Sequence, residues 1–427
     1  MAAQTLFDGN VGARFGVAYT PFSRSLVPRK RRQIEQGNRE RPIQLPQRSI
    51  YLGDMLSPDT GEIIGDARLP LSSKTGINEA INVYGASGSG KSVLMRLLIE
   101  HFAIDEHRSV IILDMTKNQY WAFGLPNRRE EMVAALRKHG IKPTTIPDVD
   151  VYVPIYDEPV LGFDVMRRDW HATKLLSIKT AGLTSQGFFE LGDIDASGKM
   201  YQNYLETIMN VPKNQKTIEY IRSELEEQAR DKTKSRSIQS LLNLFNPLTQ
   251  QGIIRDNGTD IREMLHTPRN GRPGKISVIS LGTSAPNDRR KKALISSLLQ
   301  QLFDAVKDDL SLKPVLVTDE TKEIAPKKST DSPATYGMMG RIHLQCRAWN
   351  VTRICGFQEQ DHVADFLLGT NTPINISLSK SLTLADGYTK INDTGLGHVF
   401  IEGTGDRSIP DMDFLAKFVP CRTHHID

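Results

Sequence analysis

The stretch INVYGASGSGKS, residues 81–92, runs from a short apolar strand directly into a glycine-rich loop that ends in Lys-Ser. It matches the phosphate-loop pattern G-x-x-x-x-G-K-[ST] in full. Glycines in such a loop let the backbone curl until successive N–H groups point at phosphate oxygens, and the lysine reaches the β- and γ-phosphates. Apolar residues at helical spacing follow, so a helix N-terminus adds partial positive charge. The predicted nucleotide-binding residues are Gly85, Ala86, Ser87, Gly88, Ser89, Gly90, Lys91 and Ser92.

A pair of carboxylates follows a second apolar run. PVLVT, residues 314–318, is typical of a buried strand, and Asp319 and Glu320 come directly after it. Ligands of open α/β sheets gather at the carboxyl ends of the strands, so we expect this pair beside the phosphate loop. Asp319 would hold Mg²⁺ from the side opposite the Ser92 hydroxyl, and Glu320 would orient and deprotonate the attacking water. A solvent-facing acidic strand end is the alternative.

Two further polar residues flank the next strand. Gln358 follows VTRICGF, residues 351–357, where its amide could touch the γ-phosphate or the attacking water. Arg347 lies eleven residues earlier. An arginine there could reach the nucleotide of a neighbouring subunit and stabilise transition-state charge. From the residues alone, Gln358 could equally be an ordinary loop amide and Arg347 a surface residue or a helix cap.

Strand-like and helical segments alternate along most of the chain, which predicts an α/β fold with a mostly parallel sheet. A long stretch with helical periodicity interrupts this alternation, and we interpret it as an insertion, although a separate helical domain would show the same pattern. The expected parts are a basic, flexible arm at 1–48, the first part of the core at 49–168, a mostly helical insertion at 169–270 and the second part of the core at 271–427.

Basic residues are concentrated near the N-terminus. Residues 1–50 contain nine Lys/Arg against three Asp/Glu, a net charge of +6, although the whole chain carries only +4. The run Arg29–Arg32 is typical either of an arm that meets a phosphate backbone or an acidic partner, or of a solvated terminus. A second basic segment, TSAPNDRRKK at 283–292, is either a DNA-facing loop or a solvated helix start.

The phosphate loop, the Asp-Glu strand, the Arg347–Gln358 spacing and the helical insertion together resemble the HerA/FtsK superfamily of motor ATPases. The resemblance covers roughly residues 49–405, and Asp114 with Lys117 is similar to the polar loop after the family's second strand. It implies a RecA-like P-loop NTPase core and hexameric rings in which Arg347 acts in trans. It also implies the roles given above for Lys91, Ser92, Asp319, Glu320 and Gln358. The loop DMTKNQY at 114–120 departs from the more usual Asp-Pro-Lys-Gly.

The expected function is therefore an ATP-hydrolysing ring motor, with ATP and Mg²⁺ as cofactors, that translocates a polymer, with double-stranded DNA as the expected substrate. A secretion-type ATPase that moves protein or pilus subunits, or an ATP-gated scaffold with little turnover, would carry the same loop. No apolar run is long enough to span a bilayer, and the three cysteines fit neither a disulfide framework nor a zinc site, so we expect a cytoplasmic protein. The sequence leaves open whether a nuclease or a membrane complex acts with it.

Overall fold

The computed structural model describes residues 48–57, 59–71, 79–115, 120–155, 172–185, 187–188, 199–230, 235–265, 271–281, 289–328, 333–345, 348–369, 374–379, 381–384, 387–390, 396–402 and 412–424. All of them belong to one compact unit, Leu45–Asp427. The predicted basic run Arg29–Arg32, Lys117 and Arg347 lie outside the described residues. In the part of the chain that is described, no helix combines the length and apolar character needed to cross a membrane.

The strands are β1 (Ser49–Leu56), β2 (Ile63–Pro70), β3 (Ala80–Gly85), β4 (Val110–Asp114), β5 (Val149–Pro154), β6 (Ala172–Leu176), β7 (Ile178–Lys179), β8 (Ile254–Arg255), β9 (Ile276–Ser280), β10 (Val315–Asp319), β11 (Thr352–Phe357), β12 (Ile374–Ser379), β13 (Ser381–Leu384), β14 (Gly387–Lys390), β15 (Leu396–Glu402) and β16 (Met412–Phe418). The helices are α1 (Lys91–Glu100), α2 (Glu130–Lys138), α6 (Lys199–Met209), α7 (Ile218–Ala229), α8 (Ser235–Gln250), α9 (Arg289–Asp308), α10 (Pro333–Gln345) and α11 (Asp365–Leu368). A π-helical turn, η1 (His101–Asp105), continues α1.

A twelve-stranded sheet with the order β2-β1-β16-β15-β12-β3-β11-β10-β4-β9-β5-β6 forms the centre of the unit. All strand pairs from β12 to β6 in this order are parallel, and the pairs from β2 to β12 are antiparallel. The predicted mostly parallel α/β core is thus confirmed. The phosphate-loop strand β3 lies between β12 and β11.

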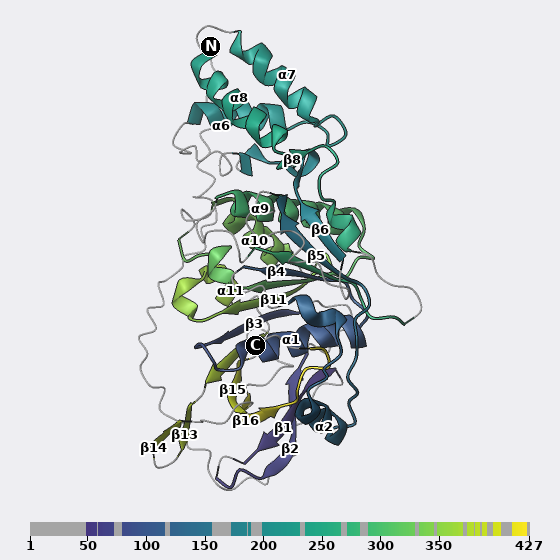
Figure 1. The fold of residues 1–427 in the computed structure, drawn as a ribbon. Helices are drawn as coiled ribbons and strands as arrows, with labels where there is room; N and C mark the ends of the chain where they lie inside the picture. The colour runs from purple at the N-terminus through teal and green to yellow at the C-terminus, as the bar shows by residue number, and fades with distance from the viewer. Residues whose placement is uncertain are drawn as a thin grey trace. The chain divides into compact units, whose positions relative to one another are not determined.

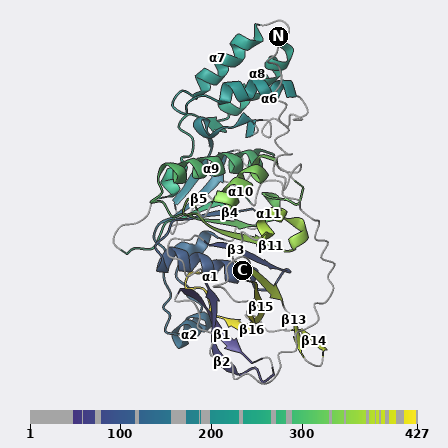
Figure 2. The same cartoon turned by 180° about the vertical axis from the view of Figure 1, so that it is seen from behind.

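Helices cover both faces of the parallel part of the sheet. Figure 1 shows α1 on one face and α9 and α10 on the other, and Figure 2 shows the same layers from behind. Alternating side chains of β4 explain the layers, because Val110 and Ile112 pack into the core under α1 while Ile111 and Leu113 pack into the core under α9. Such β-branched and apolar runs are typical of strands that are buried on both faces.

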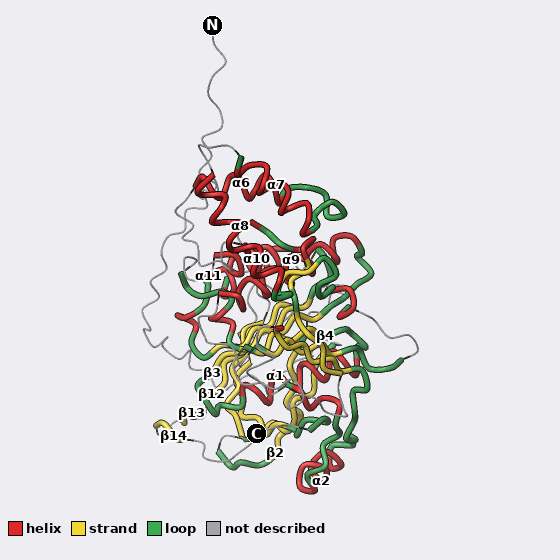
Figure 3. The backbone as a smooth tube through the Cα atoms, turned by 45° about the horizontal axis from the view of Figure 1, so that its top comes forward, coloured by secondary structure: helices red, strands yellow, loops and turns green. Residues whose placement is uncertain are grey.

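The boundary predicted for the helical insertion is too early. Residues 172–176, which the sequence assigned to the insertion, form the edge strand β6 of the large sheet and pair in parallel with β5. The segment ATKLL is half-exposed and lacks a continuous apolar run, so its strand character is weak in the sequence. Helices α6, α7 and α8 follow and are grouped together in Figure 3. Their buried side chains, such as Leu205, Ile221 and Phe245, join the apolar core of α9.

Candidate active site

The loop between β3 and α1 has a backbone that requires glycine at two positions. Gly88 and Gly90 have φ angles of 76° and 93°, in the left-handed region that residues with a side chain rarely adopt. Gly90 is also the N-cap of α1, where it provides no side-chain hydrogen bond, and the first turn contains no acidic residue. The first N–H groups of the helix have no intrahelical partner, so they can bind an anion in this loop.

The phosphate loop packs closely against residues of β12 and β16. A Cβ at Gly85 would lie 2.5 Å from Ser89 Oγ and 2.6 Å from the Leu378 carbonyl of β12. A Cβ at Gly90 would lie 3.3 Å from the ring of Phe418, the last residue of β16. The C-terminal strands, which the sequence did not assign to the site, therefore form part of the support of the loop.

The ends of β3, β11 and β10 bring three predicted residues together. Glu320 Oε1 lies 3.8 Å from Lys91 Nζ and accepts a hydrogen bond of 3.3 Å from Gln358 Nε2. The carboxylate is almost fully buried, with 4% of Glu320 exposed. Because β11 separates β3 from β10, Gln358 is placed between the phosphate loop and the acidic pair. Lysine, carboxylate and amide thus share one side of the sheet edge.

Lys322 is a neighbour of this group that sequence analysis missed. Its Nζ lies 3.8 Å from Glu320 Oε2, and that oxygen has no hydrogen-bond partner among the described residues. Glu320 itself has φ 58° and ψ 55°, a left-handed conformation. In this conformation the Glu320 carboxylate lies beside Lys91 and Gln358. Lys322 occurs in a polar segment without periodicity, so the sequence carried no signal for it.

Asp319 lies beside a second aspartate. Parallel pairing places Asp319 of β10 opposite Asp114 of β4, and both residues are buried. The backbone N–H of Tyr120 donates to Asp114 Oδ2 and the Tyr120 hydroxyl donates to Asp319 Oδ2, each at 3.4 Å. Tyr120 is the last residue of the segment DMTKNQY, which the sequence analysis compared with the family's polar loop without giving Tyr120 a role.

The donor set at this edge fits Mg²⁺. No cluster of three or more His, Cys, Asp or Glu residues that could hold a metal is found in the described parts of the chain. Mg²⁺ is usually bound by one or two carboxylates together with phosphate oxygens and water, so a protein cage is not needed. The Asp319 carboxylate and the Ser92 hydroxyl, in the first turn of α1, are oxygen donors of the kind that such a site would use.

Where the basic segment 283–292 is described, it agrees with the helix-start alternative, except that Lys291 is not solvated. Residues 282–288 lie outside the described residues, but α9 begins at Arg289 and includes Lys291. Lys291 is only 2% exposed, and its Nζ donates a hydrogen bond of 2.8 Å to the Met115 carbonyl, directly after β4. Lys291 therefore supports the end of β4 and does not face a polymer. The helix turns one member of the RRKK run inward, which the run of charges could not reveal.

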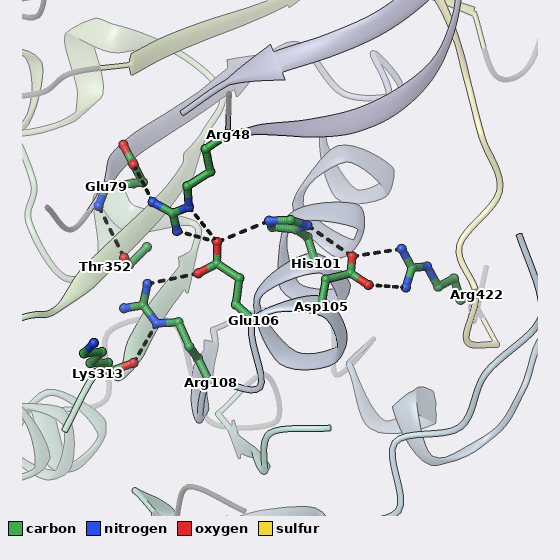
Figure 4. Close-up of polar contacts among 9 residues, drawn as sticks. All are labelled: Arg48, Glu79, His101, Asp105, Glu106, Arg108, Lys313, Thr352 and Arg422. Carbon is green, nitrogen blue, oxygen red and sulfur yellow. Dashed lines mark hydrogen bonds and ion pairs between the residues drawn. The ribbon is translucent and has the colours of Figure 1, made fainter. Parts of the chain in front are cut away.

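The far end of α1 is tied to the beginning of the described chain (Figure 4). The Arg48 guanidinium donates to Glu106, at 3.0 Å from Nε, and pairs with Glu79 at 3.3 Å. Glu79 directly precedes β3, and Glu106 directly follows η1. Burial opposes the charged form, but hydrogen bonds from His101 and Arg48 lower the pKa of Glu106 to about 2. Arg48 thus clamps the two ends of the β3–loop–α1 unit together.

A second ion pair ties the same end to the C-terminal segment. Arg422 donates two hydrogen bonds of 2.7 and 2.9 Å to the Asp105 carboxylate, and His101 Nδ1 lies 3.1 Å from it (Figure 4). Although burial acts in the opposite direction, these hydrogen bonds lower the pKa of Asp105 to about 2. Glu100 accepts the backbone N–H groups of Arg422 and Thr423. The helix that starts at the phosphate loop is therefore fixed at its other end.

Comparisons with known proteins agree with the fold. The family model of the central domain of helicase HerA matches residues 50–302. VirB4 of Thermoanaerobacter pseudethanolicus is 14% identical with a TM-score of 0.51, over 87% of this chain and 96% of that chain. The plasmid coupling protein TrwB in complex with ADP and Mg²⁺ is 12% identical with a TM-score of 0.48, over 88% and 96% of the two chains.

A third solved structure that matches this chain is a viral NTPase. The genome packaging NTPase B204 from Sulfolobus turreted icosahedral virus 2 is 11% identical with a TM-score of 0.31, over 80% of this chain and 98% of that chain. No curated protein gives a significant match. At 14% identity, the similarity to VirB4 concerns the fold alone. The similarity to VirB4 and the family match together confirm the RecA-like P-loop NTPase fold.

Proposed function

The chain belongs to the family of the HerA helicase central domain, and from this premise we propose that it is an ATP-driven motor that translocates double-stranded DNA. The observation that carries the proposal is the convergence of Lys91, Glu320 and Gln358 at the carboxyl edge of β3, β10 and β11. A phosphate loop alone accounts for nucleotide binding. A buried carboxylate held beside its lysine adds a group that can act on water.

ATP would bind with its phosphates against the backbone N–H groups of the loop and of the first turn of α1. Lys91 would then leave Glu320 for the β- and γ-phosphates. Mg²⁺, held by Ser92 and Asp319, would neutralise charge that develops on the phosphates. Glu320, still held by Gln358, would orient the attacking water and accept its proton, a contribution of about 10²–10⁴ in rate.

In a ring, a residue of the neighbouring subunit would contribute to hydrolysis. We assign this role to Arg347, which would stabilise transition-state charge in trans, and we expect a hexameric assembly. Gln358 touches the catalytic carboxylate from a neighbouring strand, so a change at the γ-phosphate can be passed from Glu320 to β11. Movements of this kind at successive subunits would advance the polymer.

The proposal is tested by ATP turnover with duplex DNA, single-stranded DNA or an unfolded protein as the added polymer. We expect stimulation by duplex DNA and an assembly of hexameric mass with a non-hydrolysable analogue. Stimulation by unfolded protein alone would instead indicate a secretion-type motor. An assembled ring without turnover under any of these conditions would indicate an ATP-gated scaffold.

The catalytic assignment is tested by Glu320→Gln. The variant keeps the size of the side chain and removes its ability to accept a proton. We expect nucleotide binding to be retained and turnover to fall by about 10²–10⁴. Normal turnover in this variant would show that Glu320 is not the base.

A further inference from the structure

Tyr120 is a buried residue at the edge of the candidate site. It directly precedes a short 3₁₀ turn (Trp121–Gly124) and is 1% exposed. Its ring stacks on that of Phe123, with 6.3 Å between the ring centroids and 13° between the planes. The direction of the hydroxyl is therefore set by packing, and bulk water cannot compete for it.

The backbone N–H and the side-chain hydroxyl of Tyr120 connect two strands. Its N–H donates to Asp114 at the end of β4, and its hydroxyl donates to Asp319 at the end of β10. The two aspartates are buried register partners on adjacent strands, and two ionised carboxylates at such positions would repel each other. The two donors of Tyr120, one to each carboxylate, would offset part of this repulsion. Both hydrogen bonds are long at 3.4 Å, as is common in catalytic sites that tighten when a ligand binds.

The other oxygen of Asp319 is restrained by the neighbouring strand. A Cβ at Gly356 of β11 would lie 3.3 Å from Asp319 Oδ1, so this oxygen packs closely against the glycine backbone. With Tyr120 on Oδ2 and Gly356 beside Oδ1, the plane of the carboxylate has little freedom. A carboxylate held in this way is pre-oriented toward a cation at the strand edge.

We propose that Tyr120 is a positioning residue for the metal site, because its hydroxyl orients Asp319 toward Mg²⁺. The inference rests on the proposed function, since it assumes that Asp319 holds the metal of a nucleotide complex. Groups that orient metal ligands typically change metal affinity by about 10–100-fold when they are removed. The hydroxyl of Tyr120 donates to Asp319, a candidate metal ligand outside the phosphate loop, so its removal should leave metal-free nucleotide binding unchanged.

The test is Tyr120→Phe, which removes the hydroxyl and keeps the ring, its stacking on Phe123 and the backbone N–H. The chain offers a matched control in Tyr152→Phe. Tyr152 is also 1% exposed and its hydroxyl donates to Asp150 at the same distance of 3.4 Å, but on β5. Each purified variant is titrated with Mg²⁺ in the presence of fluorescent ADP, and nucleotide binding without Mg²⁺ and the melting temperature are measured in parallel.

We expect the Mg²⁺ concentration at half-saturation to rise about tenfold in Tyr120→Phe, with unchanged metal-free ADP binding and an unchanged value in Tyr152→Phe. A wild-type value in Tyr120→Phe, or an equal rise in both variants, would overturn the inference. Asp114→Ala is a second test, because it removes the acceptor of the Tyr120 backbone N–H and keeps the Tyr120 hydroxyl. This variant should raise the Mg²⁺ requirement too, and an unchanged requirement would contradict the role of Tyr120.

The same titration separates this inference from the proposed function. If the wild-type protein binds ADP without any effect of Mg²⁺, the proposed Mg²⁺-dependent ATPase fails. If the wild-type protein shows a normal Mg²⁺ dependence and Tyr120→Phe shares it, only the role of Tyr120 fails. Mn²⁺ binding to the ADP complex, followed by electron paramagnetic resonance, gives the same answer without any measurement of turnover.

Discussion

Glu320 has a backbone conformation that few residues with a side chain adopt. A left-handed conformation costs about 1–2 kcal/mol for a residue other than glycine, and such conformations are concentrated at functional sites. Contacts with Lys91, Gln358 and Lys322 hold the carboxylate in return. The order Asp-Glu after a buried strand was visible in the sequence. The left-handed backbone of Glu320 was not, because a local sequence pattern does not reveal a single backbone angle.

Gly356 is a glycine outside the phosphate loop whose replacement should disturb the candidate site. A Cβ there would lie 2.5 Å from Met95 Sδ as well as close to Asp319, so Gly356→Ala overpacks the space between α1 and β10. We expect a loss of about 1–3 kcal/mol in the free energy of unfolding and a lower turnover. Gly337→Ala is the control, because nothing lies within 4 Å of a Cβ at that position in α10. It should stabilise the helix by about 0.5–1 kcal/mol.

Chemical unfolding curves measure both glycine variants. An unchanged stability and turnover in Gly356→Ala would show that the packing between β11 and Met95 is looser than the structure indicates. The double variant Gly356→Ala with Met95→Val removes the clashing sulfur, so part of the lost stability should return.

Lys291 and Lys292 are adjacent in the sequence and differ in their surroundings. Lys291 is buried and donates to the Met115 carbonyl, whereas Lys292 is half-buried. Lys291→Met removes that donor, and we expect a loss of about 1–3 kcal/mol in the free energy of unfolding. Lys292→Met should change stability by less than Lys291→Met. Equal effects in thermal unfolding experiments would contradict the structural role of Lys291.

The elements that the sequence predicted well are those in which local pattern and burial agree. The parallel strands β4, β5, β9 and β10 are short runs of buried apolar residues, so composition alone identifies them. The antiparallel extension was harder, because β1, which pairs with β2, also pairs with β16 from the other end of the chain. Pairing over such a separation leaves no local signal. Phe418, which packs on the phosphate loop, was missed for this reason.

The ion pairs at the far end of α1 predict how stability depends on pH. In the folded protein the pKa values of Asp105 and Glu106 are about 2, below their ordinary values of 3.8 and 4.5. Carboxyls with lowered pKa contribute stability that is present above their unfolded values and is lost as the pH falls toward 2. His101 acts in the opposite direction, because its raised pKa gives a contribution that is lost at higher pH.

Melting temperatures measured from pH 6 to pH 2.5 test this dependence. We expect the melting temperature to fall below about pH 4.5, and the fall to be shallower in Asp105→Asn, which cannot lose a charge there. Asp361→Asn, an exposed carboxylate away from the cluster, is the control and should follow the wild-type curve. A wild-type slope in Asp105→Asn would show that the Arg422 pair contributes little to stability.

Elements from distant parts of the described chain pack together around the candidate site. One core joins α6, α7 and α8 to α9, and the C-terminal strands support the phosphate loop from the other side. The family match covers residues 50–302 and includes the loop, whereas Asp319, Glu320 and Gln358 lie beyond it. Their placement beside Lys91 is therefore structural information that the match does not contain. It makes the chain a candidate for hydrolysis as well as for nucleotide binding.

Displacement of a third strand from duplex DNA measures translocation itself. We predict that the wild-type protein displaces the strand with ATP and Mg²⁺, and that a non-hydrolysable analogue and Glu320→Gln both abolish displacement. ATP hydrolysis by the wild-type protein without any displacement of the third strand would contradict the proposal that this site drives movement along DNA.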